Sequence, residues 1–448
     1  MSQSFIVACE GGKRKIAEIL LEKEQVDVSY TDELGRTALH YAAHRGYLDL
    51  VKKLVAAGAA IDYEDHRGET PLYFALLQKQ KQTAAYLLDK GADIHINDFS
   101  GNSLLHITAR TGQQDMVENL ITAGLDVNVL NNEAEPPLLL AVQAKYPSVV
   151  QLLVGKGANL DITDKAGNTP LNIAVALGAV PIVNILLDNG AAVNVLNDLS
   201  EGPLLLAVKT GNRILAQKLL EQGSNIFAES AEGISPVWYV CNSNQKELLA
   251  LFLDRGLSPD YARPVDSFDG KDGKYLEKLI AQTGGRTLIL GYEPHYAGET
   301  LLQTATKMGY LSLVKQLLDS GAAIDKQDAS GNTALHYAAS YGKKDVLRYL
   351  LSNGASADIS NVLEQKPIDY SNIQGFNEIT ALLIDFGAKT NAVQDGPVTP
   401  GKKVAPEAKS GMDMGLKKQA LFDLKELLDA GIINQAEFDQ EKAKILGA

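Results

Sequence analysis

The chain has 448 residues, which is too long for one ordinary hydrophobic core, so several domains or a repeat array are expected. Hydrophobic residues make up 45% of the chain and charged residues 22%, a balance typical of folded globular proteins rather than disordered ones. The formal net charge of −13 opposes binding to nucleic acid and to anionic membrane surfaces, and no basic patch is evident in the sequence.

The two cysteines, Cys9 and Cys241, lie far apart without a CxxC motif or a nearby histidine cluster. We therefore expect two buried free thiols in a reducing compartment and no metal site or cofactor. The apolar stretch at residues 5–9 is too short for a signal peptide, and no segment reaches the about 18 apolar residues of a membrane span. The sequence thus predicts a cytoplasmic protein without direct membrane insertion.

Glycines recur with a period of 33 residues, which predicts a repeat array. They occur at positions 58, 91, 124, 157, 190, 223 and 256, and again at 321, 354 and 387. A second ladder keeps the same phase, with Leu39, Leu72 and Leu105 as its first members and a small residue three places after most of them. Between the ladders, apolar residues follow helical spacing up to the glycine. Each unit is therefore predicted to contain a turn, a short helix, a second turn and a second helix.

The turns carry a motif that resembles the ankyrin-repeat signature Asp-x-x-Gly-x-Thr-Pro-Leu-His-x-Ala. Residues 65–75 read DHRGETPLYFA, residues 164–174 read DKAGNTPLNIA, and residues 328–338 read DASGNTALHYA. Asp stabilises the turn, Gly provides a positive φ, and Thr-Pro begins the helix. The resemblance implies an all-α repeat solenoid in which each unit is a β-hairpin finger followed by two antiparallel helices.

The repeat pattern predicts the domain organisation of the chain. We expect an ankyrin array over 1–391, followed by a flexible linker at 392–415 that is rich in Pro, Gly, Lys and Ala. Within the array, residues 1–31 suit an N-terminal cap, 32–260 hold seven repeats, and 295–391 hold three repeats that include a C-terminal cap. The glycine that follows the first helix is replaced by Lys79 and Lys145, so those turns are expected to close differently.

The segment 261–294 interrupts the repeat pattern. Its length is close to one repeat, and residues 275–285 could form a second helix, but the residues of a first helix are missing. A degenerate repeat and an insertion both fit this pattern. If the segment leaves the array, we expect the array to be bent or split into 1–260 and 295–391.

Residues 416–448 have a different composition from the array and predict two short amphipathic helices that form a hairpin. The sequence LKELLDAGIINQAEF at 424–438 resembles the short C-terminal domain known as SHOCT, with Asn434 in place of the usual Thr. The resemblance implies a bacterial or phage chain and a role in homo-oligomerisation or partner attachment. Its candidate contact residues are Leu424, Leu427, Leu428, Ile432, Phe438 and Ile445.

No catalytic or metal-binding motif is evident, so we expect a protein that is not an enzyme. The family resemblance implies that His40, His106 and His336 bind backbone groups between fingers. Trp238 replaces this histidine next to the interruption, where packing at the junction is favoured over a role as a binding anchor.

The resemblance implies a binding surface formed by finger residues and by the residues that end each first helix, the concave face of an ankyrin array. We call it the finger surface. Several of its residues are large and apolar, which is typical of interface anchors surrounded by polar residues. The candidates are Leu34, Arg36, His44, Arg45, His66, Arg67, Leu77, Phe99, Arg110, Glu133, Leu177, Leu199, Lys209, Ile234, Lys307, Met308 and Tyr341.

Three functions follow from these patterns. The favoured one is a non-enzymatic scaffold or adaptor that binds a protein partner on the finger surface, with the C-terminal hairpin mediating oligomerisation or recruitment. The second is a bacterial or phage effector, inhibitor or immunity protein that neutralises a target by binding. The third and least favoured is an enzyme that uses the 261–294 segment, which offers few convergent polar groups.

Overall fold

A computed structural model of the chain describes residues 2–23, 26–263, 298–362 and 364–388. The chain divides into two compact units, Met1–Thr390 and Asn391–Ala448. The second unit lies outside the described residues, and so do the predicted linker and C-terminal hairpin. The fold described below is therefore that of the repeat array.

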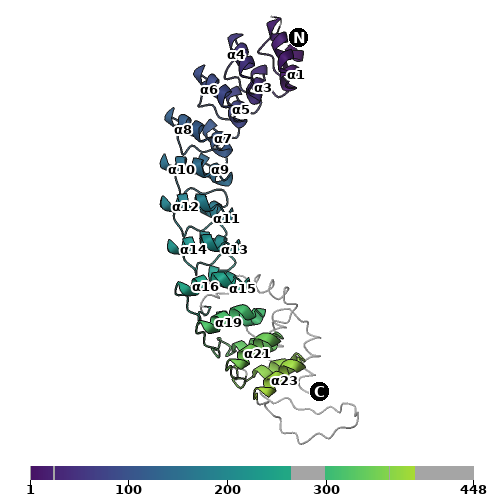
Figure 1. Cartoon of the computed structure of the whole chain (residues 1–448), viewed down its shortest axis with the longest axis vertical. Helices are drawn as coiled ribbons and strands as arrows, with labels where there is room; N and C mark the ends of the chain where they lie inside the picture. Colours follow the sequence, from purple (N-terminus) through teal and green to yellow (C-terminus); the bar gives the residue numbers. More distant parts are fainter. Residues whose placement is uncertain (1, 24–25, 264–297, 363, 389–448) are drawn as a thin grey trace, which may run out of the picture. The chain divides into compact units, whose positions relative to one another are not determined.

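The described residues form successive pairs of short helices, which confirms the predicted all-α repeat solenoid (Figure 1). The first helices of the pairs are α1 Ser2–Glu10, α3 Ala38–Arg45, α5 Pro71–Leu77, α7 Leu104–Thr111, α9 Pro137–Gln143, α11 Pro170–Ala176, α13 Pro203–Lys209, α15 Pro236–Asn242, α18 Leu301–Met308, α20 Ala334–Ser340 and α22 Pro367–Ile373. The second helices are α2 Arg14–Glu22, α4 Leu48–Ala56, α6 Lys81–Asp89, α8 Gln114–Thr122, α10 Pro147–Gly155, α12 Val180–Asp188, α14 Arg213–Glu221, α16 Lys246–Asp254, α19 Leu311–Asp319, α21 Lys344–Ser352 and α23 Asn377–Asp385.

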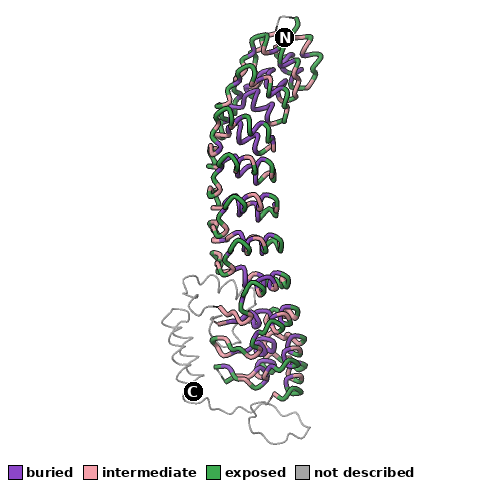
Figure 2. The backbone as a smooth tube through the Cα atoms, turned by 60° about the vertical axis from the view of Figure 1, so that its left-hand side comes forward, coloured by how far each residue is buried: buried purple, intermediate pink, exposed green. Residues whose placement is uncertain are grey.

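Each first helix packs against the first helices of the neighbouring pairs, and the hydrophobic core runs continuously between them. Burial recurs in every described pair, while the turns between helices are largely exposed (Figure 2). The ladder residues Leu39, Leu72 and Leu105 are all fully buried. Because one pair cannot bury its apolar face alone, the stability of each pair depends on its neighbours.

The fingers are turns held by side-chain and backbone hydrogen bonds, and no regular strand occurs in the described ranges. In a typical finger, the Asp65 carboxylate accepts bonds from the backbone N–H groups of Arg67 (2.8 Å) and Glu69 (3.0 Å). Thr70 caps the next helix by accepting a bond from Tyr73 N (3.2 Å), and Pro71 is its first residue. The roles predicted for Asp, Thr and Pro in the signature are thus confirmed.

The turns at Lys79 and Lys145 correct one expectation from the sequence. Both lysines adopt a φ of 58°, the left-handed conformation that glycine supplies in most other pairs. The turn after the first helix closes with the same bond in both cases, Gln80 N to Ala75 O (2.8 Å) and Tyr146 N to Ala141 O (3.0 Å). The turn geometry is kept without glycine, so the prediction of a different closure was wrong.

The two ends of the array differ in polarity. The third residue of a second helix, such as Leu50 in α4, is buried in the pairs that follow. In α2, at the N-terminal end, the same position is occupied by Ile16, which is exposed. At the C-terminal end, Asn372 and Thr380 occupy positions that are apolar in most other pairs, and they bond to each other (3.1 Å). The C-terminal pair therefore has the polar outer surface expected of a cap.

The helix pairs on either side of the interruption pack directly against each other. α15 contacts α18 and α16 contacts α19, as neighbouring pairs do elsewhere. The Asp260 carboxylate accepts a bond from Ala323 N (2.8 Å), matching the bond from Asp93 N to Asp62 (3.0 Å) between uninterrupted pairs. These contacts contradict a split of the array at this position.

The flanks of the interruption have the geometry of a finger base. Arg263 N donates to Glu299 O (3.0 Å), just as Asp65 N donates to Glu69 O (3.1 Å) in a normal finger. Arg263, Gly298 and Glu299 thus correspond to Asp65, Gly68 and Glu69 of a normal finger. Residues 264–297 lie outside the described residues, and with them most of the segment predicted as a degenerate repeat or an insertion and the second helix considered at 275–285.

Candidate binding surface

All of the predicted finger-surface residues lie in the described part of the chain, and none of them is buried. Leu34, Phe99 and Leu199 are the most exposed of the large apolar ones, at 52%, 68% and 61%. Exposing large apolar side chains to water is unfavourable, so a group of exposed ones marks a surface suited to binding. The partly buried candidates are Arg36, His44, Leu77, Ile234, Lys307 and Tyr341.

Several predicted residues already have partners within the chain. The Arg36 guanidinium pairs with Asp65 (2.9 Å) and Glu69 (3.3 Å) and lies 4.6 Å from the centre of the Phe74 ring. Tyr341 stacks on Tyr337, with 6.4 Å between ring centres. Both side chains therefore make structural contacts within the array.

Three further charged candidates form ion pairs. Lys209 pairs with Glu201 within its own unit, and Glu133 pairs with Lys165 of the next finger. Lys307 lies 3.8 Å from Glu299, and its pKa is lowered because burial disfavours the ammonium. The paired residues lie 8 to 32 positions apart in the sequence, so a short sequence motif does not reveal the pairing.

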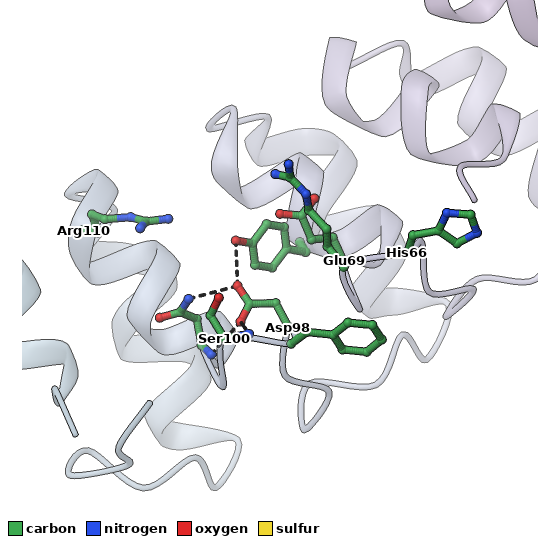
Figure 3. Close-up of a pocket in the computed structure, with 9 residues that line it drawn as sticks. His66, Glu69, Asp98, Ser100 and Arg110 are labelled. Carbon is green, nitrogen blue, oxygen red and sulfur yellow. Dashed lines mark hydrogen bonds between the residues drawn. The ribbon is translucent and has the colours of Figure 1, made fainter. Parts of the chain in front are cut away.

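Four of the predicted residues meet at one pocket of about 380 Å³ between two successive fingers (Figure 3). His66 and Arg67 belong to the first finger, Phe99 belongs to the second, and Arg110 extends toward the pocket from the end of α7. Glu69, Tyr73, Asp98, Ser100 and Asn102 complete the lining of the pocket. Asp98, Ser100 and Asn102 belong to the second finger, whose sequence motif holds them for the turn.

The carboxylates of this pocket are engaged within the protein. Asp98 accepts bonds from Ser100 N (2.9 Å), Asn102 N (2.8 Å) and the Tyr73 hydroxyl (3.1 Å). Burial and the neighbouring Asp98 raise the pKa of Tyr73, so the phenol remains a donor at neutral pH. Glu69 pairs with Arg36, and burial is the main cause that raises its pKa.

The exposed finger-tip side chains lie over the glycines of the preceding finger. A Cβ atom at Gly68 would lie 2.7 Å from the Phe99 ring, and one at Gly35 would lie 2.6 Å from the His66 ring. Because glycine has no side chain, the Phe99 and His66 rings can pack directly against the backbone of the preceding finger. The Phe99 ring is held in this way at the rim of the pocket.

The signature histidines are structural, as the family resemblance implied. His40 Nδ1 accepts a bond from Thr37 N (3.0 Å), so the neutral ring carries its proton on Nε2, which donates to Glu69 O (3.1 Å) of the next finger. His106 and His336 repeat this arrangement. Burial lowers the pKa of His40 and of His336 to about 4, so both are neutral at pH 7.

Trp238 packs at the junction and is only 1% exposed, which excludes it as an anchor for a partner. Its ring lies 5.7 Å from that of Tyr261, and the Arg263 guanidinium lies 4.6 Å from its centre. These two residues lead into the interruption, so Trp238 holds the base of the enlarged finger.

The cysteines are buried free thiols, as predicted. Burial raises the pKa of Cys9 and of Cys241 to about 12, so neither forms a reactive thiolate at neutral pH. Among the residues that the structure describes, no group of three His, Cys, Asp or Glu side chains is placed to hold a metal ion. In the same residues, no helix is long and apolar enough to span a membrane.

Comparison with known families finds two matches. A family model described as ankyrin repeats (3 copies) matches residues 5–98, 105–197, 272–361 and 301–395, which together exceed half of the chain. A second family model, described as short C-terminal domain, matches residues 419–446. No curated protein matches the chain.

Proposed function

Because this chain belongs to the ankyrin-repeat family, we propose that it is a non-enzymatic adaptor or scaffold that binds a protein partner through its finger surface. The observation that carries this proposal is the exposure of Leu34, Phe99 and Leu199 at finger tips. Apolar anchors surrounded by polar and charged groups supply most of the free energy in protein interfaces. The enzyme alternative relied on residues 261–294, and those from 264 on lie outside the described residues.

A pull-down experiment tests the proposed surface. The variant Leu34→Ala, Phe99→Ala, Leu199→Ala removes the three anchors, and we expect the amount of partner captured from a lysate of the source organism to fall at least tenfold. The three side chains are exposed, so their loss should change thermal stability little. The measurement is quantitative mass spectrometry of the captured proteins.

The control variant is Ile214→Ala, which removes a similarly exposed side chain (66%) from the second helix α14. Capture should be unchanged in this control. Equal capture by the triple variant, once its folding is verified by circular dichroism, would contradict a role for the finger surface. An adjacent toxin gene or phage genes would instead favour the effector or immunity function.

We further infer that residues 416–448 provide a second attachment point, through homo-oligomerisation or recruitment. The family match over 419–446 supports this, because a segment of about 30 residues is too short to bury a core of its own and gains stability by docking. Replacing Leu424 and Phe438 with Asp is expected to reduce the molar mass of the full chain in light scattering to that of a monomer. The same mass in the wild type and in this variant would leave recruitment as the only role for the segment.

A further inference from the structure

Two arginines line the pocket between the fingers at 66–69 and 98–102, in a protein whose net charge is −13. Arg67 and Arg110 line it, and neither forms an ion pair with any residue that the structure describes. The positive charge of Arg110 lowers the pKa of Tyr73 and so opposes the increase that burial causes. The charge of Arg67 likewise lowers the pKa of Glu69. Both guanidinium groups therefore contribute a positive potential to the pocket.

The carboxylates of the pocket are bound by other groups of the protein and form no ion pair with Arg67 or Arg110 among the described residues. The Asp98 carboxylate accepts bonds from Ser100, Asn102 and Tyr73 (Figure 3). Glu69 is paired with Arg36 from the preceding finger. A carboxylate that entered the pocket would thus meet guanidinium donors that have no competing partner among the described residues. Guanidinium groups bind carboxylates with two parallel hydrogen bonds, the strongest arrangement for such a pair.

The rim of the pocket is apolar. Phe99 is 68% exposed, and its ring is fixed against Gly68. A ligand whose carboxylate reaches the arginines would therefore place its neighbouring atoms on an aromatic ring, where an aliphatic or aromatic side chain gains the most. A volume of about 380 Å³ holds one or two side chains rather than a folded domain.

These observations favour a protein segment over nucleic acid. The net charge of −13 repels a long polyanion. A single side-chain carboxylate avoids most of this repulsion because it is one charge placed between two arginines.

We propose that this pocket binds a Glu or Asp side chain from an extended segment of the protein partner, with an adjacent apolar side chain on Phe99. The inference rests on the proposed function and specifies the chemistry of the segment recognised at this part of the finger surface. Arg67 and Arg110 bind the carboxylate, and Phe99 sets the preference for the neighbouring residue.

The test measures binding of fluorescein-labelled peptides to the full chain by fluorescence anisotropy. One peptide alternates Glu and Phe, a second replaces every Glu with Gln, and a single-stranded DNA 20-mer is the nucleic-acid probe. We expect the Glu peptide to bind at least tenfold more tightly than the Gln peptide and the DNA. Its affinity should fall by a further tenfold or more between 50 and 300 mM NaCl, because the contact is ionic and exposed.

The double variant Arg67→Ala, Arg110→Ala is expected to lose at least tenfold in affinity for the Glu peptide. The matched control is Arg213→Ala, Arg348→Ala, which removes two exposed arginines from the second helices α14 and α21 and should change affinity less than twofold. Equal affinity for the Glu and Gln peptides, equal loss in both double variants, or tighter binding of the DNA would each overturn the proposal.

Pull-downs with the same variants separate this inference from the proposed function. Capture of the partner that is lost in the Leu34, Phe99 and Leu199 variant but retained in Arg67→Ala, Arg110→Ala would overturn the pocket alone. Capture retained in both variants would overturn the finger surface itself.

Discussion

Replacing Trp238 with alanine is expected to separate the unfolding of the array into two transitions. The side chain is buried, and its removal leaves a cavity beneath Tyr261 and Arg263 at the junction between α15 and α18. Substitutions of this kind cost about 3–5 kcal/mol. Here the loss falls on the interface that couples neighbouring repeats. The pairs from α18 to α23 should then unfold at lower urea concentration than those from α1 to α14.

The measurement is urea unfolding followed by circular dichroism, with hydrogen exchange and mass spectrometry to assign each transition to its residues. In the wild type, the fluorescence of Trp238 reports on the junction directly, because it is the sole tryptophan. Ile214→Ala is the control, since it removes an exposed side chain and should leave one transition. An unshifted single transition in Trp238→Ala would mean that the junction does not depend on this ring.

Lowering the pH below 6.5 is expected to destabilise the array chiefly where the buried histidines lie. Their pKa is depressed in the folded state, to about 4 for His40 and His336 against an ordinary histidine value of 6.5. The stabilisation is therefore complete above about pH 6.5 and is lost as the pH falls toward 4, because the unfolded chain takes up the proton first. Each histidine contributes at most about 3 kcal/mol to this loss.

The variant His336→Gln isolates this effect from the titration of carboxylates. Gln303 occupies the equivalent position of another pair, where its amide accepts from Thr300 N (2.8 Å) and donates to Asn332 O (2.9 Å). Glutamine can thus replace both histidine bonds without a titrating group. We expect unchanged stability at pH 7.5 and a smaller loss at pH 4.5, measured by urea unfolding. Equal losses in wild type and variant would contradict a role for His336 protonation.

The repeat period made most of the fold predictable from the sequence. A leucine at most steps of the ladder and a glycine after the second helices placed the helix pairs, because their spacing reflects local backbone geometry. The left-handed lysines were not predictable in the same way. Lys79 and Lys145 adopt a conformation that costs free energy locally, and the packing of the surrounding pairs compensates for that cost.

The candidate surface was predictable in position but not in its internal pairings. The motif placed Arg36 and Phe99 in fingers, and both lie there, Arg36 at the base of its finger and Phe99 at the tip. Whether a finger residue is engaged depends on the neighbouring finger, about 30 residues away, where Arg36 meets Asp65 while the Phe99 side chain stays largely exposed. The pocket likewise needs two fingers and the end of α7 together, and no single motif contains all three.

The enlarged finger between Arg263 and Glu299 shows where such an array can acquire new sequence during evolution. A finger is closed at its base by two backbone bonds, which are both present between Arg263 and the pair Gly298 and Glu299, and the helices on either side still pack against each other. Lengthening the tip roughly tenfold raises the entropy cost of closing it by only about 2 kcal/mol. Every other finger of the array offers the same opportunity, which makes the row of tips a set of equivalent positions for grafting a peptide or a small domain.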